Sequence, residues 1–331
     1  KRVGFHMYVY NGIKEAQIVL DLDHRDQLIG ANIEVVDSQT IQGYRYSTAW
    51  AEKQKIHFYI KLSSPIKESI YRKDSLVIGF KFGELKNPLL LKVGISSVSI
   101  ENAKENLNHE IPHWNFNETL LETRISWDRE LNKIQVETKD ETRKEIFYTS
   151  LYHSLLNPNL FSDVNGDYLG TDFKIHNSKE RQYTVFSLWD TFRATHPLFT
   201  IIQRQKTQEF LKTFLRQYKD GGQLPVWELA ANYTGCMIGY HAIPVITDAY
   251  VKGITDFDKE LALEAMINSA NQDHLGLEQY KKNGFISSSD EPESVSKTLE
   301  YAYDDWCIAK FAELIGEDSI SSIFYERAQN Y

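Results

Sequence analysis

The sequence predicts a β + α protein of more than one domain, in which an antiparallel β-sandwich is followed by a helical region. Three observations support this fold class. The chain has 331 residues, which is more than one ordinary core supports. Short segments rich in β-branched and aromatic residues fill the first part, with Gly and Pro between them. Beyond residue 141 nearly every segment has helical spacing.

The sandwich is expected to cover residues 1–100. Ile56, Phe58 and Ile60 alternate with His57 and Tyr59, which predicts a strand with one buried face and one wet face. Strands that recur at short, regular intervals are typical of an antiparallel sandwich, and Gly30 and Gly43 are interpreted as breaks between them. The expected strands are 5–10, 16–22, 56–62, 76–82 and 89–98.

A helical linker is expected at 101–140, with helices at 99–107 and 118–136 separated by Pro112 and Trp114. The helical domain then covers 141–331, with no strand between its helices. Its last helix reaches Tyr331 without a stop signal, so we expect the domain to continue beyond the given sequence. The expected helices are 142–156, 188–203, 206–219, 240–253, 258–271, 294–315 and 319–331.

The helix at 294–315 has apolar residues at steps of four and three, which predicts one buried stripe with charged residues on the opposite side. The predicted stripe consists of Val295, Leu299, Ala302, Trp306 and Ala309, and the charged residues opposite are Lys297, Glu300 and Asp304.

Composition limits the function classes. A net charge of −9 disfavours a nucleic-acid partner, and no apolar run has the eighteen or so residues that a membrane-spanning helix needs. Aromatic residues make up 13% of the chain, which suits the flat faces of sugars but is equally explained by a large aromatic core. Cys236 and Cys307, each in an apolar helical pattern, are expected to be free thiols.

The candidate functional residues lie in the stretch 183–253, where polar side chains stand among apolar runs. Trp189, Asp190 and Arg193 have the chemistry of a sugar site, an aromatic ring beside a carboxylate and a guanidinium. Two structural alternatives remain open. Ser187 and Asp190 have the spacing of a capping box, and Asp190 and Arg193 have that of a surface ion pair.

Other acidic and basic residues are weaker candidates. Glu228 follows Trp227 in an apolar segment. It either serves in proton transfer or binds a sugar hydroxyl, or it is an acid at the start of a helix. His241 is interpreted as a satisfied core histidine. Asp304 and Asp305 point about 100° apart on a helix, so they cannot converge on one ion, and one of them is expected to be solvated.

The loop FSDVNGDYLGTD places Asp163, Asn165 and Asp167 at the spacing of calcium ligands. However, Tyr168 and Lys174 occupy the positions where an EF-hand has Gly and Glu. The loop is therefore interpreted as a polar turn.

Four long motifs, in this order, resemble those of the α-mannosidases of glycoside hydrolase family 92. They are FYTSLYHSLLNPNLFSDVNGDYLGTD, YTVFSLWDTFRATHPLFTII, GGQLPVWELAANYTGCMIGYHAIPVITDAY and ESVSKTLEYAYDDWCIAKFA. The resemblance covers the chain from about residue 16. It implies a β-sandwich, a linker and an (α/α)6 toroid, of which only part is present here. It further implies calcium-dependent, inverting, exo-acting hydrolysis of terminal α-mannose on N-glycans or mannans, by a periplasmic, secreted or cell-surface enzyme.

In that resemblance, Asp190 matches an acid that binds the outer hydroxyls of the terminal sugar. No catalytic residue is assigned, because the motifs with the family's acid and base are expected after Tyr331, and the Ca²⁺ ligands are not assigned either. Tyr233 stands where the family carries Glu. The substrate-binding candidates are Trp189, Asp190, Arg193, Trp227, Glu228, His241 and Asp305.

Half a toroid would leave large apolar helix faces in water. The polypeptide alone is therefore expected to be inactive, and unstable unless a missing segment or another copy covers those faces. Two other functions remain open. One is a non-catalytic carbohydrate-binding or assembly protein that retains the scaffold, and the other is an unrelated glycosidase or lyase on the same fold.

Overall fold

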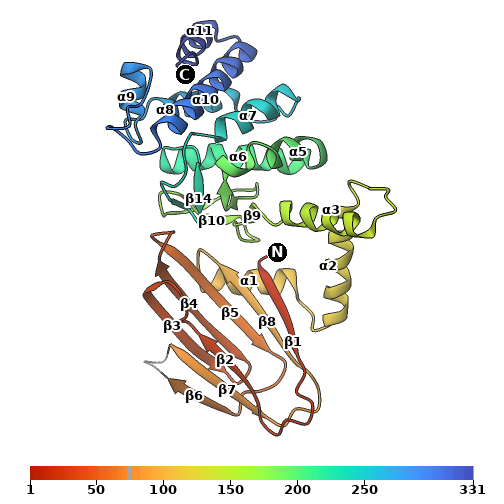
Figure 1. The fold of residues 1–331 in the computed structure, drawn as a ribbon. Helices are drawn as coiled ribbons and strands as arrows, with labels where there is room; N and C mark the ends of the chain where they lie inside the picture. Colours follow the sequence, from red (N-terminus) through yellow and green to blue (C-terminus); the bar gives the residue numbers. More distant parts are fainter. Residues whose placement is uncertain (73–75, 331) are drawn as a thin grey trace. The chain divides into compact units, whose positions relative to one another are not determined.

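The computed structural model describes residues 1–72 and 76–330. Two compact units can be distinguished (Figure 1). The first, here the sandwich unit, comprises Lys1–His153, Leu160–Leu169 and Lys174–Arg181. The second, the helical unit, comprises the remaining segments, of which the longest begins at Gln182. Among the helices that the structure describes, none has the length and hydropathy to cross a membrane.

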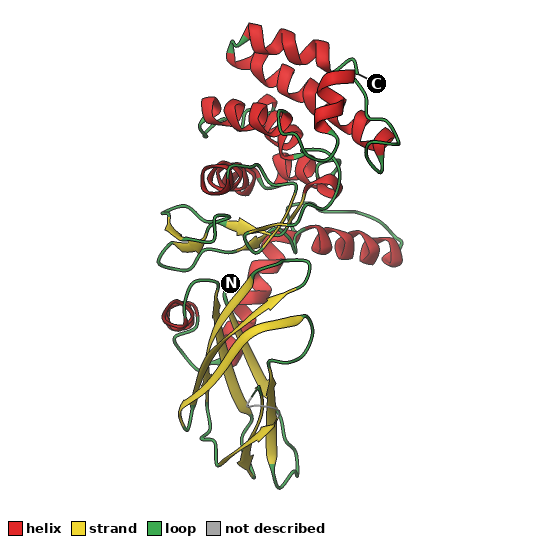
Figure 2. Cartoon of the chain, turned by 90° about the vertical axis from the view of Figure 1, so that its left-hand side faces the viewer, coloured by secondary structure: helices red, strands yellow, loops and turns green. Residues whose placement is uncertain are grey.

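Two antiparallel sheets form the sandwich (Figure 2). One has five strands in the order β1-β8-β5-β4-β3 and the other has three in the order β2-β7-β6. Phe58 and Leu89 from the larger sheet pack against Ile78 and Phe80 from the smaller one, so the core lies between the two layers. The strands are β1 (Val3–Tyr8), β2 (Ala16–Asp21), β3 (Gln27–Asp37), β4 (Thr40–Thr48), β5 (Gln54–Leu62), β6 (Glu68–Arg72), β7 (Val77–Gly83) and β8 (Leu89–Ser96).

The antiparallel sandwich is confirmed, but the sequence did not predict strands β3, β4 and β6. Gly30 lies inside β3 and Gly43 lies inside β4, opposite Phe58, so neither glycine separates strands. A Cβ atom at Gly43 would come within 2.0 Å of the Asn32 carbonyl oxygen. This glycine therefore allows a close approach of two strands. In the sequence, such a glycine cannot be distinguished from one that marks a turn.

Helix α1 (Ile100–Glu110) covers part of the outer face of the larger sheet, where Ala103 and Leu107 pack on Tyr59. His57 and Tyr59 are therefore buried, and the expectation of a wet face on β5 is wrong. Two further helices follow, α2 (Phe116–Leu131) and α3 (Glu141–Ser154). Helix α2 ends five residues before the expected position.

Among the described residues that follow α3 there are seven short strands, so the expectation of an all-helical region is wrong. Three of them form the small sheet β13-β14-β15, which leads directly into α4. The strands are β9 (Asn159–Leu160), β10 (Asp167–Leu169), β11 (Ile175–Asn177), β12 (Tyr183–Thr184), β13 (Phe186–Ser187), β14 (Trp227–Leu229) and β15 (Asn232–Tyr233).

The predicted helices of this unit are present, with two corrections. The helix expected at 188–203 is interrupted at residues 192–194, and a short helix at 277–283 was not expected. The last helix ends at Arg327, and Tyr331 lies outside the described residues. The helices are α4 (Leu188–Thr191), α5 (Thr195–Ile202), α6 (Arg204–Gly221), α7 (Ala242–Val251), α8 (Lys259–Ala270), α9 (Leu277–Asn283), α10 (Ser294–Ile315) and α11 (Asp318–Arg327).

The predicted buried stripe of α10 is largely wrong. Val295 is 72% exposed, Leu299 50% and Trp306 45%, whereas Lys297 and Asp304 are buried. Ala302 and Ala309 are the members of the stripe that are buried. The apolar residues of α10 are distributed around most of the helix, so their spacing does not indicate which face is buried. The buried polar groups determine which face of α10 is buried, because their partners lie on neighbouring segments.

Both cysteines are free, as expected. Cys307 is buried in α10, but Cys236 lies in the loop between β15 and α7 and not in a helix.

Candidate functional site

Asp190 lies in the single turn of α4, which directly follows β13. Its side chain is exposed, and the Ser187 hydroxyl donates a hydrogen bond to its carboxylate. Ser187 occupies the N-cap position but makes no hydrogen bond to a backbone N–H, so the capping box is incomplete. The proposed Asp190–Arg193 ion pair is not formed either, because Arg193 pairs with Glu300.

Glu300 on α10 holds both neighbours of Asp190. Arg193 Nη2 donates to its Oε1 at 2.6 Å, and Trp189 Nε1 donates to the same atom at 3.3 Å. Burial alone would raise the pKa of Glu300, but the hydrogen bonds and positive charges of His241 and Arg193 lower it to about 2. Glu300 is therefore ionised and fixes the turn from which Asp190 projects.

His241 lies between two carboxylates at the N-terminal end of α7. Its Nδ1 is 2.8 Å from Asp304 Oδ1, and its Nε2 is 3.1 Å from Glu300 Oε2. The Phe192 ring stacks on the imidazole at a centroid distance of 4.2 Å. Burial lowers the pKa of His241, but Asp304 and Glu300 raise it further, to about 9. An imidazolium with both nitrogens facing carboxylates has no free basic nitrogen at neutral pH.

Glu228 lies on β14 and not at the start of a helix. Its Oε1 accepts hydrogen bonds from the Thr184 hydroxyl at 2.9 Å and from the Ala231 N–H at 2.6 Å, while its Oε2 has no hydrogen-bond partner in the described structure. Burial raises its pKa to about 7. Trp227 precedes it on the strand and pairs with Ser187 on β13.

Asp304 and Asp305 are both fully buried, so the expectation that one is solvated is wrong. They diverge as expected. Asp304 bonds to His241 and to the Tyr240 N–H. Asp305 accepts hydrogen bonds from the Tyr240 hydroxyl at 2.7 Å and from Arg327 Nε at 2.7 Å. Burial raises the pKa of Asp305 to about 6, against the opposing effect of Arg327.

The structure thus brings Trp189, Arg193 and His241 together around one carboxylate. Glu228 belongs to a separate hydrogen-bond network, whereas Asp305 is connected to His241 through Tyr240 and Asp304. The sequence reasoning missed Glu300 as a site residue, although the Glu300 and Asp304 spacing of i,i+4 places both carboxylates on one face of α10. That signal could have identified the partners of His241.

Residues 1–72 and 76–330 contain no group of three or more His, Cys, Asp or Glu side chains that could hold a metal ion. In the loop singled out from the sequence, Asp163 accepts hydrogen bonds from Ser96 at 2.6 Å, from Asn102 at 2.9 Å and from Asn106 at 2.6 Å. Donors that point at a carboxylate occupy the lone pairs that Ca²⁺ would need. The interpretation as a polar turn is confirmed.

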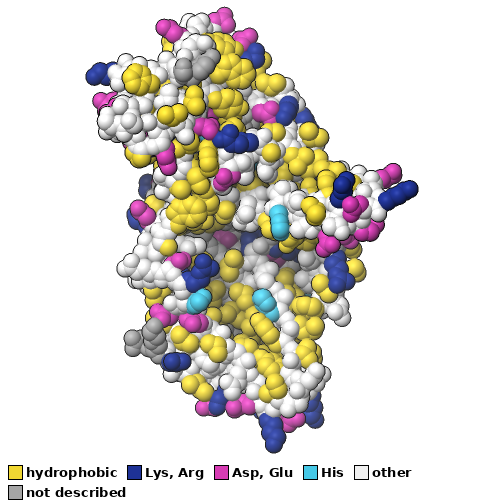
Figure 3. Space-filling model, in the orientation of Figure 1, with side chains coloured by type: hydrophobic (Ala, Val, Ile, Leu, Met, Phe, Trp, Pro, Cys, Tyr) yellow, Lys and Arg dark blue, Asp and Glu magenta, His cyan; other side chains and the backbone are white. Residues whose placement is uncertain are grey.

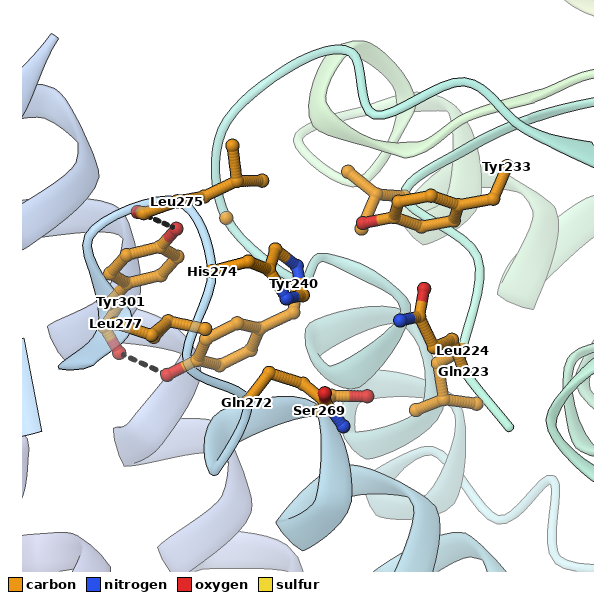
Figure 4. Close-up of a pocket in the computed structure, with 12 residues that line it drawn as sticks. Gln223, Leu224, Tyr233, Tyr240, Ser269, Gln272, His274, Leu275, Leu277 and Tyr301 are labelled. Atoms are coloured by element: carbon orange, nitrogen blue, oxygen red, sulfur yellow. Dashed lines mark hydrogen bonds between the residues drawn. The ribbon is translucent and has the colours of Figure 1, made fainter. Parts of the chain in front are cut away.

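Two small cavities open near the β14–β15 hairpin. One, of about 20 Å³, is lined by side chains that include Tyr233, Tyr240, Gln272 and His274 (Figure 4). The other, of about 50 Å³, lies beside Glu228 and shares Gln223 and Tyr233 with the first. Asp190 is not part of the lining of either cavity.

Comparison with known proteins gives consistent matches. Residues 102–331 match the catalytic-domain model of glycosyl hydrolase family 92, and residues 1–96 match its N-terminal-domain model. A family GH92 α-mannosidase of Bacteroides thetaiotaomicron has 33% sequence identity and a TM-score of 0.95 over 100% of this chain, which covers 48% of that structure. A structure of the same enzyme is a complex with mannoimidazole.

A second structure from that organism, described as a family GH92 inverting mannosidase, has 29% identity and a TM-score of 0.92; this chain is covered completely and spans 48% of it. An uncharacterized secreted glycosidase of Arthroderma benhamiae is 25% identical over 72% of this chain and 29% of its own length. The chain therefore spans about half of these solved relatives and less of the curated one.

Proposed function

Because the chain belongs to glycosyl hydrolase family 92, we propose that it is part of an exo-acting α-mannosidase that removes terminal α-linked mannose from N-glycans or mannans. Its α-mannosidase relatives support the reaction class, and the mannoimidazole complex of one of them supports a mannose-like ligand. The proposal includes inversion of the anomeric centre and an (α/α)6 toroid around the site. A periplasmic, secreted or cell-surface location agrees with the secreted relative.

The observation that carries the proposal is the arrangement of α4 around Asp190. Trp189 and Arg193, on either side of it in the chain, are both held by Glu300, while Asp190 itself is exposed. A carboxylate in this position accepts hydrogen bonds from sugar hydroxyls, and charge-assisted bonds of this kind are about twice as strong as neutral ones. In this proposal Asp190 orients the terminal mannose and does not transfer a proton. Trp189, Arg193 and His241 do not act on the sugar directly in this proposal. Their contacts with Glu300 hold the turn that carries Asp190.

Calcium dependence is part of the proposal, although the described residues contain no group of three or more His, Cys, Asp or Glu side chains that could hold a metal ion. When bound, Ca²⁺ would supply a hard cation for the vicinal hydroxyls of mannose.

The test uses the full-length protein with an aryl α-mannoside. We expect turnover that chelation abolishes, and a loss of about 10²-fold or more in kcat/KM for Asp190→Asn, equivalent to about 2.7 kcal/mol. The matched control is Asp248→Asn, an acid on α7 that pairs with Lys252. The polypeptide of residues 1–331 alone is expected to show no turnover.

Several outcomes would contradict this proposal. Calcium-dependent turnover by residues 1–331 alone would refute the expected inactivity of this polypeptide. Binding of mannoimidazole by the full-length protein without turnover would favour a carbohydrate-binding function. An unchanged kcat/KM in Asp190→Asn would remove the role assigned to this residue.

A further inference from the structure

The carboxyl group of Glu228 holds two backbone turns that are unusual for their residues. Val185, Ala230 and Ala231 have φ angles of 67°, 49° and 67°, in the left-handed region that non-glycine residues rarely occupy. Glu228 Oε1 accepts the Ala231 N–H, and the Thr184 hydroxyl, which donates to the same Oε1, accepts the Ala230 N–H at 2.7 Å. The carboxyl is thus fixed from one side.

Glu228 also lines a cavity. Glu228 Oε2 is buried without a hydrogen-bond partner, and so is Gln217 Oε1, and both residues line the same space of about 50 Å³. Thr171 also lines this space. Its hydroxyl donates to the Gln217 carbonyl at 3.0 Å, so the lone pairs of the hydroxyl oxygen can still accept. The remaining lining residues are Gly221, Gln223, Pro225 and Tyr233.

The charge of this site is not balanced within the lining. No Lys, Arg or His is among the residues described as lining the cavity, and Tyr233 is the other titratable side chain there. Burial raises the pKa of the Tyr233 hydroxyl, so it is neutral. A buried carboxylate without a counter-charge is unfavourable, and either a proton or a bound cation relieves it. Burial raises the pKa of Glu228 to about 7, so above that pH the proton is lost.

The available donor atoms are all oxygens, which hard cations prefer. A single carboxylate balances one positive charge, whereas the sites that hold Ca²⁺ gather several charged ligands. The cavity exceeds the space that one water molecule needs. We propose that the cavity beside Glu228 is a binding site for a monovalent cation such as K⁺ or Na⁺, held by Glu228 Oε2, Gln217 Oε1 and the Thr171 hydroxyl.

This site is independent of the mannosidase function, and its test needs no turnover. Thermal unfolding is followed at pH 8.5 and pH 6 in KCl, in NaCl and in choline chloride at equal ionic strength, since choline is too large for the cavity. We expect KCl or NaCl to raise Tm by several degrees over choline at pH 8.5, and by less at pH 6, where a proton occupies the carboxyl. The shift should disappear in Glu228→Gln and persist in Glu264→Gln, which removes an exposed carboxylate of α8.

If Glu228→Gln does not fold, Gln217→Leu can be used instead, because it retains the carboxylate. This variant should bind the cation more weakly and raise the half-saturating cation concentration several-fold. Crystals soaked in Rb⁺ or Tl⁺ should show an anomalous peak within about 3.5 Å of Glu228 Oε2. Equal Tm values in all three chlorides at pH 8.5, together with no anomalous peak, mean that the cavity holds only water and overturn the proposal. A cation-dependent shift of the same size in Glu228→Gln also overturns it, because the ion then binds elsewhere.

Discussion

His241 shows how two neighbouring carboxylates set the charge of a buried histidine. Asp304 and Glu300 approach its two ring nitrogens, and they raise its pKa to about 9 even though burial opposes the charge. The folded-state pKa is above the unfolded value of about 6.5, so the imidazolium stabilises the fold fully below pH 6.5. This contribution is lost as pH rises through 9.

We therefore expect His241→Gln to reduce the free energy of unfolding by about 3 kcal/mol at pH 6, since it leaves two carboxylates without their buried cation. The difference from the unaltered protein should shrink between pH 6.5 and pH 10. Urea unfolding over this range measures it.

His196→Gln is the matched control. His196 is also buried in the helical unit, but burial lowers its pKa to about 4, so it is neutral throughout this range. Its stability difference should not change between pH 7.5 and pH 10, where the imidazole is neutral in both the folded and the unfolded state. A constant difference in His241→Gln as well would show that His241 is neutral in the folded protein.

At the scale of elements, Arg327 attaches α11 to two other helices. Its Nε donates to Asp305 of α10 at 2.7 Å, and its Nη2 donates to the carbonyl of Ala270, the last residue of α8, at 2.7 Å. Asp305 is fully buried, so removal of the guanidinium leaves a carboxylate in the interior without its counter-charge.

We expect Arg327→Met to lower the free energy of unfolding by about 3 to 5 kcal/mol. Amide hydrogen exchange in α11 should accelerate more than in α8. Lys310→Met is the control, because the exposed Lys310–Glu313 pair within α10 should contribute less than about 1 kcal/mol. Equal exchange rates of α11 in both variants would mean that apolar packing, and not Arg327, holds this helix.

The segment that carries the candidate site shows why a motif does not specify its own contacts. The sequence WDTFR allowed a capping box, an ion pair or a sugar site. None of these three interpretations included a partner elsewhere in the chain, but Arg193 and Trp189 bond to Glu300, more than one hundred positions later. Local spacing cannot reveal such a partner.

At the scale of the whole molecule, the chain exposes apolar side chains on its C-terminal helices. Val295, Leu299 and Trp306 on α10 and Ile323 on α11 are exposed. Figure 3 shows hydrophobic side chains among charged ones on the visible face of the helical unit. Exposed apolar side chains promote association when they gather on one face.

We expect the polypeptide of residues 1–331 to self-associate at micromolar concentration, and Leu299→Lys to shift it toward the monomer. Sedimentation velocity measures the change. Ile70→Lys, on the exposed side of β6 in the sandwich unit, is the matched control and should leave association unchanged. A monomer at all concentrations, or an equal effect of the two variants, would contradict a role of α10 in association.

The sequence by itself determined the order of sandwich and helices, the position of most helices and the family. These properties follow from local periodicity and from long motifs, which are written in neighbouring residues. It did not determine the strands around Gly43, where a side chain would clash with the carbonyl of Asn32 on the neighbouring strand. It also assigned the wrong face of α10 to the core.

Only the tertiary structure decided which polar groups meet. It gave His241 two acidic neighbours, left Glu228 Oε2 buried without a hydrogen-bond partner and buried both Asp304 and Asp305. The physical reason is that the free energy of a buried charge depends on groups brought together from distant parts of the chain, and no local pattern records that pairing.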